Sequence, residues 1–169
     1  MTSAVRTSLR RTSWEPFDAN EVRDLYDDYA LMLDAGDYAA WLELFVPDAS
    51  YTVISRENVE RGLPLAVIRC ESRGMMADRV DALESTQFYA RRFTRHMVSA
   101  LCPVAHDAGV LATTANFVVA ETIIDESTQL AWAGRYDDRI VRVDDRLQFV
   151  EKTAVYDSAM VPTSLIVPL

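Results

Sequence analysis

Two cysteines and two histidines are the side chains most suited to bind a transition metal in this sequence. They are Cys70, His96, Cys102 and His106. An iron–sulfur cluster held by cysteine and histidine needs two closely spaced Cys/His pairs, and a mononuclear non-haem iron needs two histidines and a carboxylate that converge. Each of the four residues stands alone, because we expect His96 at the start of a strand and His106 in a turn a full strand later. The sequence therefore predicts no metal site in this chain.

Acid–base catalysis is the second kind of chemistry that these side chains could support. A curved sheet with helices over one face encloses a cavity, and Tyr38, Tyr51, His96 and Asp157 could supply polar groups to it. The competing interpretation is that a lone histidine at a strand start is a hydrogen-bonded structural residue. Five glycines leave no phosphate-binding loop, and no motif for a serine or cysteine nucleophile is present. We expect no catalytic and no cofactor-binding residue.

Arginine is concentrated between Ser55 and Leu101, whereas Lys152 is the only lysine of the chain. The planar guanidinium group is suited to pair with carboxylates at buried or interfacial positions. We therefore predict that this stretch contains a docking surface for another protein. The candidate interface residues are Arg56, Glu57, Asn58, Arg73, Arg79, Arg91, Arg92, Arg95 and His96. The alternatives are a polar loop paired within the chain for the first three, and a solvated basic face for the arginines beyond residue 90.

The composition argues against several classes of function. The 169 residues carry a net charge of −9, whereas a nucleic-acid-binding protein normally has a basic face. The sequence contains no run of 18 apolar residues, which a membrane span would need. The N-terminus lacks the apolar region of a secretory signal. Two cysteines make no disulfide framework, so we expect reduced thiols in a cytoplasmic protein.

The first part of the chain has the pattern of helices that follow a flexible arm. Residues 1–16 are expected to form this arm, and residues 17–169 are expected to form one domain. Asp18 and Glu21 are spaced as a capping box, and apolar residues then recur every three or four positions. Gly36 is typical of the end of such a helix. The sequence thus predicts a helix between Asp18 and Gly36.

The next segments are shorter. Asp37 begins a second helix that Pro47 ends, and residues 51–54 are expected to form a strand. Residues 63–68 fit either a strand or a helix. Ser72 can cap a third helix. Its expected apolar face consists of Met75, Met76, Val80 and Leu83.

From His96 onward, valine, isoleucine, threonine and tyrosine dominate, as in strands. The predicted strands are Met97–Val104, Val110–Ile124, Gln129–Val143 and Leu147–Asp157. Short turn sequences join them, which indicates an antiparallel meander. Helices first and strands last are typical of the α+β class, with the helices on one face of a curved sheet.

Several motifs in a fixed order resemble the small (β) subunits of aromatic-ring-hydroxylating dioxygenases. The motifs are YALMLDAGDYAAWLELFVPDASY, RENVERGLPLAVI, SRGMMADRVDAL, RRFTRHMVS, the pair Tyr156–Asp157 and the tail SLIVPL. The resemblance runs from Asp18 to Leu169, and SRGM-x-x-DRV is its strongest element. Ala90 stands where the family often has proline, and Ala100 stands near the place where it often has asparagine.

This resemblance implies a cone-shaped fold like that of nuclear transport factor, with a curved, mostly antiparallel sheet and N-terminal helices on one face. It also implies a structural subunit without catalytic residues, in an NAD(P)H-dependent hexamer of three large and three small chains. The small chains would form a trimer. The Rieske [2Fe–2S] cluster and the mononuclear Fe(II) are expected in the large (α) subunit. Terephthalate, salicylate or anthranilate, which are carboxylated single rings, are the expected substrates.

Two other functions stay open on the residues alone. One is a free-standing cone-fold dehydratase or isomerase in which His96 acts as acid and base. The other is a non-catalytic ligand-binding scaffold. The apolar tail at Ser164–Leu169 is expected to pack into the protein or against a neighbour.

Overall fold

The computed structural model describes residues 13–85, 90–158 and 168–169. Residues 1–12 of the predicted arm lie outside this part, and Trp14 packs against the hydrophobic core. In chain order the elements are α1 (Ala19–Ala35), α2 (Tyr38–Leu42), β1 (Phe45–Ser55), α3 (Arg56–Glu60), β2 (Ala66–Cys70), α4 (Arg73–Ser85), β3 (Arg92–Asp107), β4 (Val110–Ile123), β5 (Gln129–Val143) and β6 (Arg146–Tyr156).

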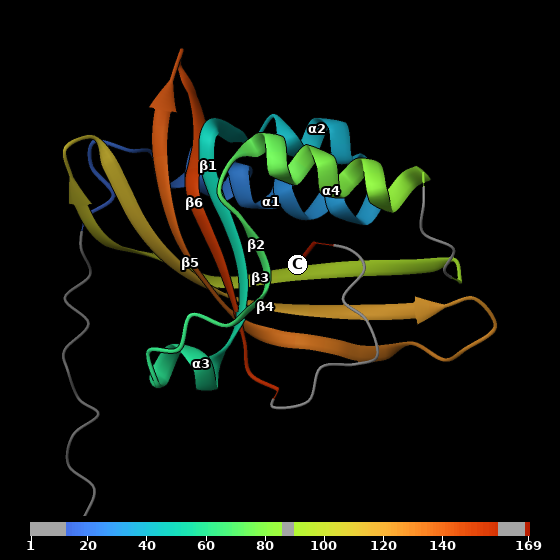
Figure 1. The fold of residues 1–169 in the computed structure, drawn as a ribbon. Coiled ribbons are helices and arrows are strands. Elements are labelled where there is room, and N and C mark those ends of the chain that lie inside the picture. Colours follow the sequence, from blue (N-terminus) through green and yellow to red (C-terminus); the bar gives the residue numbers. More distant parts are fainter. Residues whose placement is uncertain (1–12, 86–89, 159–167) are drawn as a thin grey trace, which may run out of the picture.

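The six strands form one open sheet in the order β2-β1-β6-β5-β4-β3. Neighbouring strands are antiparallel except β1 and β6, which are parallel. Helices α1, α2 and α4 lie together over one face of this curved sheet (Figure 1). The predicted α+β cone with its antiparallel meander from β3 to β6 is therefore confirmed.

Helix α1 forms where the capping signals predict it. The Asp18 carboxylate accepts a hydrogen bond from the Asn20 backbone N–H at 2.6 Å, and Gly36 ends the helix with a φ of 72°. Glu21 differs from the expected capping-box role, because its carboxylate accepts from Arg142 of β5 instead. The buried face of α1 consists of Val22, Leu25, Tyr26, Tyr29, Ala30 and Leu33.

The prediction that the second helix continues to Pro47 is wrong. Helix α2 ends at Leu42, and Phe45 already begins β1. Proline lacks the N–H that a regular strand pairing uses, so it is confined to irregular or edge positions of a sheet. Here the register of β1 on β6 shifts between Phe45 and Ser50, so Pro47 falls in an irregular part of the pairing.

Two further local predictions need correction. Arg56, Glu57 and Asn58 lie in helix α3 and not in a loop, because the Ser55 hydroxyl accepts from the Asn58 N–H at 3.2 Å and caps a new helix. In α4, Met76 is buried but Met75 is 45% exposed, so Met75 does not belong to the apolar face.

Strand β3 is longer than predicted and contains both histidines. It begins at Arg92 and ends at Asp107, so His96 is inside the strand and His106 is near its end, not in a turn. A bulge shifts the register between Ser99 and Cys102. Such bulges bend a strand and increase its twist.

Ala100, inside this bulge, has a φ of 53°, which a residue with a Cβ adopts only at a cost. Asparagine tolerates this conformation better, so Ala100→Asn is expected to increase the free energy of unfolding by about 0.5–1 kcal/mol. Urea denaturation would measure the change. The matched control is Ala112→Asn in the regularly paired part of β4, which should be destabilising because asparagine disfavours regular strands. An equal loss of stability in both variants would contradict the proposed relief of strain.

Candidate functional site

The interior of the cone, between the helices and the sheet, is filled by aromatic side chains. Tyr26, Tyr29, Trp41, Phe45, Tyr51, Phe117, Tyr136 and Phe149 are each at most 1% exposed. They come from both helices and strands, and their rings meet mostly edge to face. The space where a cone fold could hold a substrate is therefore occupied by the protein itself.

Lys152 lies at the centre of this aromatic cluster with no exposed surface. Its Nζ is 3.7 Å from the ring centroid of Tyr136 and 4.2 Å from that of Tyr29, with Phe149 and Tyr26 slightly further away. Rings at these distances stabilise a cation through their electron-rich faces. Nζ also donates to Oδ2 of Asp138 at 2.8 Å.

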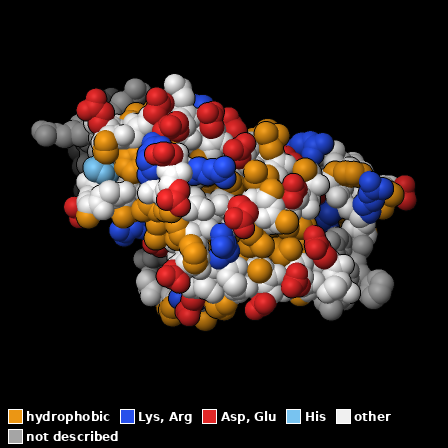
Figure 2. All heavy atoms as spheres, turned by 90° about the horizontal axis from the view of Figure 1, so that it is seen from above, with side chains coloured by type: hydrophobic (Ala, Val, Ile, Leu, Met, Phe, Trp, Pro, Cys, Tyr) orange, Lys and Arg blue, Asp and Glu red, His pale blue; other side chains and the backbone are white. Residues whose placement is uncertain are grey.

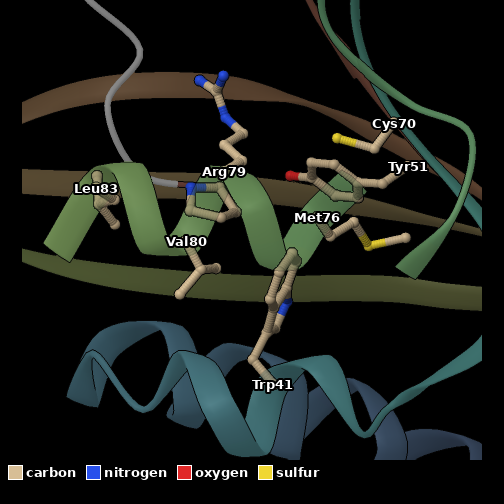
Figure 3. Close-up of a pocket in the computed structure, with 8 residues that line it drawn as sticks. Trp41, Tyr51, Cys70, Met76, Arg79, Val80 and Leu83 are labelled. Carbon is tan, nitrogen blue, oxygen red and sulfur yellow. The ribbon is translucent and has the colours of Figure 1, made fainter. Parts of the chain in front are cut away.

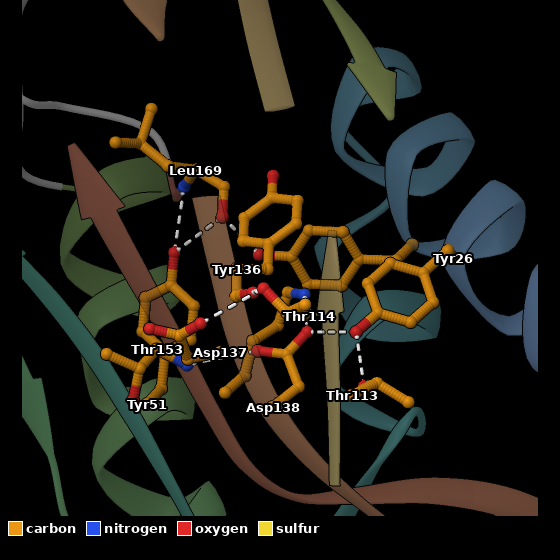
Figure 4. Close-up of polar contacts among 11 residues, drawn as sticks. Tyr26, Tyr51, Thr113, Thr114, Tyr136, Asp137, Asp138, Thr153 and Leu169 are labelled. Carbon is orange, nitrogen blue, oxygen red and sulfur yellow. Dashed lines mark hydrogen bonds and ion pairs between the residues drawn. The ribbon is translucent and has the colours of Figure 1, made fainter. Parts of the chain in front are cut away.

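Asp138 is the buried counter-ion of Lys152, and donors surround its carboxylate (Figure 4). The Tyr26 hydroxyl donates to Oδ2, and the Thr153 backbone N–H donates to Oδ1 at 3.1 Å. Tyr26 in turn shares a hydrogen bond of 2.9 Å with the Thr113 hydroxyl. The contacts satisfy the carboxylate within the fold, and none of them leads to solvent.

Burial sets the direction of the pKa shifts in this network. Desolvation raises the pKa of the Asp138 carboxyl and lowers the pKa of the Lys152 ammonium, although their mutual attraction opposes both shifts. Burial also raises the pKa of the Tyr26 hydroxyl well above its usual value, with Asp138 adding to that increase. The tyrosine is therefore a neutral donor, which suits a structural role.

The last described residues close the cone. The backbone oxygen of Leu169 accepts from the hydroxyls of Tyr29 and Tyr51, and its N–H donates to Tyr51 at 2.8 Å (Figure 4). Leu169 is 2% exposed. The predicted packing of the apolar tail is confirmed for Pro168 and Leu169, and residues 164–167 lie outside the described part.

Beside this tail, the described residues enclose a small cavity of about 10 Å³. Trp41, Tyr51, Met76, Arg79 and Val80 lie around it (Figure 3). A volume of about 10–15 Å³ holds one water molecule, whereas ligand pockets measure about 300–1,000 Å³. Two larger hollows, of about 290 and 380 Å³, lie outside the cone interior.

The four residues that could supply acid–base groups are not brought together. Tyr51 is buried in the cone, while Tyr38 is half-buried in a hollow beside the C-terminal end of α1. Asp157 is exposed and forms an ion pair of 2.8 Å with Arg56. None of the three hollows lined by described residues includes His96.

His96 makes the contacts of a structural residue on the helix-covered side of β3. Its Nδ1 lies 2.7 Å from Oδ1 of Asp34 in α1, and its backbone N–H donates to the same carboxylate at 3.1 Å. The Asp34 carboxylate therefore fastens α1 to the edge strand. The Nε2 atom is buried and has no hydrogen-bond partner among the described residues.

The histidines and cysteines do not converge. His106 packs against the Phe17 ring at a centroid distance of 5.5 Å, far along β3 from His96. Within the described ranges, no group of three or more His, Cys, Asp or Glu side chains could hold a metal ion. These residues do not fit an iron site.

The first candidate interface residues are paired within the chain. Arg56 bonds to Asp157, and Glu57 forms an ion pair of 2.9 Å with Arg61. The Asn58 side chain donates to the Leu65 carbonyl at 2.6 Å. The Asn58 bond joins α3 to the segment before β2, and the Arg56 pair joins α3 to the segment after β6. The Glu57–Arg61 pair lies within the end of the helix.

The arginines of α4 face β1, α2 and the cone interior. Arg73 donates to the Phe45 carbonyl at 3.2 Å and lies 3.6 Å from the Glu43 carboxylate. Arg79 lines the small cavity, where its charge lowers the pKa of the Tyr51 hydroxyl against the larger effect of burial.

The remaining candidates divide between two faces of β3. Thr94 and His96 are buried beneath the helices, so Arg91 and Arg95 project from the opposite, outer face. Arg92 lies on the helix side and pairs with Glu121 at 3.0 Å. The predicted basic cluster is thus two exposed arginines on one face and an ion-paired arginine on the other.

Sequence reasoning missed the Lys152–Asp138 pair. The available signal was that the alternate neighbours of the only lysine of the chain, Val150 and Ala154, are apolar, and a charge on an apolar face of a strand is costly without a partner.

The comparisons with known proteins agree with the fold. The family model described as "Ring hydroxylating beta subunit" matches residues 29–163. The small subunit of anthranilate 1,2-dioxygenase from Burkholderia cepacia is 34% identical over 149 residues, which cover 88% of this chain and 92% of that protein. Beta subunit 2 of the terminal oxygenase component of terephthalate 1,2-dioxygenase from Comamonas sp. is 28% identical over 141 residues, covering 83% and 92%.

Among solved structures, a beta subunit assigned to an aromatic-ring-hydroxylating dioxygenase of Novosphingobium aromaticivorans superposes with a TM-score of 0.81. It is 35% identical, and the match covers 89% of this chain and 95% of the other. With the family model spanning most of the sequence, these similarities confirm the resemblance drawn from the motifs. The chain belongs to the family of ring-hydroxylating dioxygenase beta subunits.

Proposed function

We propose that this chain is a non-catalytic structural subunit that supports the large, catalytic subunit of an aromatic-ring dioxygenase. The observation that carries the proposal is the filled interior of the cone. A cavity of about 10 Å³ leaves no room for an aromatic ring, and the central Lys152 is shielded by aromatic rings. Among the described residues, no side-chain cluster could bind iron.

The proposed complex is a cytoplasmic hexamer of three large and three small chains, with the small chains in a trimer. The Rieske [2Fe–2S] cluster and the mononuclear Fe(II) belong to the large subunit in this proposal, and NAD(P)H supplies the electrons. No helix of the described residues is long and apolar enough to cross a membrane. The small chain would contribute shape and contacts, not chemistry.

The proposed substrate class is a carboxylated single aromatic ring. Support comes from the anthranilate and terephthalate dioxygenases to which the chain is similar. Salicylate is a third member of this class. The substrate would be chosen by the large subunit.

The test is to purify the chain alone and together with its large subunit, and to measure iron content, visible absorbance and oxygenation. We expect iron, the absorbance of the cluster and turnover only in the co-purified complex. One iron atom bound per isolated chain, or turnover without the large subunit, would contradict the proposal.

A second candidate function rests on the Asp34–His96 pair, since a hydrogen-bonded carboxylate and imidazole can transfer protons. Asp34 also lines the hollow of about 290 Å³ at the C-terminal end of α1. A free-standing dehydratase or isomerase predicts that His96→Ala abolishes an activity of the isolated chain. The structural proposal predicts that the assembled His96→Ala complex keeps its turnover per iron. A ligand-binding scaffold would have to use an outer hollow, because the interior is filled.

A further inference from the structure

An apolar patch with two arginines covers the outer face of the sheet where β3, β4 and β5 meet. The register places Arg95 beside Ala120 and Leu130, and Met97 beside Val118 and Ala133. The backbone carbonyl of Arg91 accepts a hydrogen bond from the Ile124 N–H. Arg91 is two residues before Phe93, so the two side chains lie on the same face. We call this surface the β3 patch. It comprises Arg91, Phe93, Arg95, Met97, Val118, Ala120, Ile124, Leu130 and Ala133.

The β3 patch exposes large apolar side chains that a soluble chain normally buries. Phe93 is 46% exposed, Met97 is 53% exposed and Leu130 is 66% exposed. They gather on neighbouring strands, and contiguous exposed apolar side chains of this kind mark interaction sites. Aromatic residues, methionine and arginine are also the residue types enriched in protein interfaces.

The two arginines give the patch a positive charge in an otherwise acidic chain. Arg91 lies over the Phe93 ring at 5.1 Å, and Arg95 donates to the neighbouring Thr94 carbonyl at 2.7 Å. Neither forms an ion pair with a described residue, whereas Arg56, Arg73 and Arg92 do. Stacked and locally held guanidinium groups beside apolar side chains fit carboxylates on a partner surface.

A second copy of this chain does not fit the β3 patch. A two-fold contact would bring together two copies of the same positively charged patch, which is repulsive. The acidic side chains Asp24, Asp27 and Asp28 of α1 could attract the patch, but they lie on the helix-covered side of the fold. Acidic groups are spread over that side (Figure 2). A contact between the two opposite faces of the fold is head-to-tail, and copies stacked face to back form an open filament unless the rotation between them closes a ring.

We propose that the β3 patch docks the large oxygenase subunit, through a surface on which carboxylates alternate with apolar side chains. The inference rests on the proposed function and assigns it a contact site. Alternate residues of a strand are about 6.7 Å apart, so Arg91 and Arg95 can pair with two separate carboxylates while Phe93 and Met97 enter apolar hollows between them. Arg91 and Phe93 also border the hollow beside the C-terminal end of α1, but no residue of the patch belongs to the aromatic interior, so substitution of Arg91 and Arg95 leaves that interior intact.

The experiment is co-purification of a tagged large subunit with the small subunit carrying Arg91→Glu and Arg95→Glu together. We expect at least about tenfold less small subunit to be retained, because like charges would then face the carboxylates of the partner. The neutral variant Arg91→Gln/Arg95→Gln should show a smaller loss and a weaker dependence on ionic strength. The matched control is Arg23→Glu, a charge reversal at an exposed position of α1.

Circular dichroism and the melting temperature show whether each variant is folded, and native mass spectrometry of the isolated small subunit shows its self-association. Wild-type retention by the folded Glu variant would overturn the inference. So would a loss of self-association with retained binding to the large subunit, since a second copy would then occupy the patch. Failure of the wild-type chain to co-purify with the large subunit would instead refute the proposed function.

Discussion

Replacing Lys152 by methionine is expected to lower the free energy of unfolding by about 3–5 kcal/mol. Methionine keeps most of the side-chain volume, so the loss reports the charge and not a cavity. Asp138 would remain fully buried with only the Tyr26 hydroxyl and the Thr153 N–H as donors. Because domains are stable by only about 5–15 kcal/mol, chemical denaturation should show a large shift.

The matched double variant Lys152→Met/Asp138→Asn removes both charges and keeps an oxygen that can accept from the Thr153 N–H. It should recover most of the lost stability, because a neutral buried amide costs less than an unpaired carboxylate. The double-mutant cycle should give a coupling of about 2 kcal/mol or more. Additive effects of the two substitutions would refute the ion-pair explanation.

The stability of the Lys152→Met variant should also depend on pH. Burial raises the pKa of Asp138, and loss of the lysine removes the attraction that opposes this shift. A carboxyl whose folded-state pKa is raised contributes stability that is present below its usual value of roughly 4 and is lost as pH rises through the folded-state value. The deficit relative to the wild-type chain should therefore be smaller at pH 5 than at pH 8, as measured by urea denaturation at both values.

The sequence predicts most of the architecture because its local signals act over a few residues. Asp18 and Gly36 define both ends of α1, and the β-branched segments after residue 110 become strands with nearly the predicted bounds. Helix α3 was missed because its signal, a single Ser55 cap on five residues, is too short to show a periodic pattern. Pro47 was misleading because an irregular strand register accommodates it.

The Lys152–Asp138 pair could not be predicted, because it depends on a change of register. The pairing of Val143 with Arg146 and of Ile140 with Phe149, continued unchanged, would place Asp138 opposite Glu151. A shift between Arg139 and Ile140 moves Asp138 opposite Lys152 instead. Such a bulge leaves no clear trace in the residue pattern. The separation of Arg92 from Arg91 and Arg95 was predictable in principle, since neighbouring strand residues face opposite sides.

Gly134→Ala is expected to be the most damaging substitution that adds a single methyl group. A Cβ at this position of β5 would lie 2.1 Å from the Val155 carbonyl oxygen and 2.9 Å from the Tyr156 Cα. Both atoms belong to the backbone of β6, which pairs with β5 at this point, so no side-chain rotation can relieve the contact. The sheet would have to separate or bend locally. We expect a loss of about 3 kcal/mol or more, the upper range for overpacking.

Gly74→Ala is the matched control for the loss of stability expected from Gly134→Ala. Gly74 lies in α4, and its added Cβ would meet only the Ser72 hydroxyl at an ordinary distance of 3.6 Å. Alanine favours a helix over glycine by about 0.5–1 kcal/mol, so this variant should be more stable than the wild-type chain. Opposite shifts of the denaturation midpoint for the same chemical change would show that the close approach of β6 to β5 requires glycine. A stable Gly134→Ala chain would show instead that the two strands can separate at this point without loss of stability.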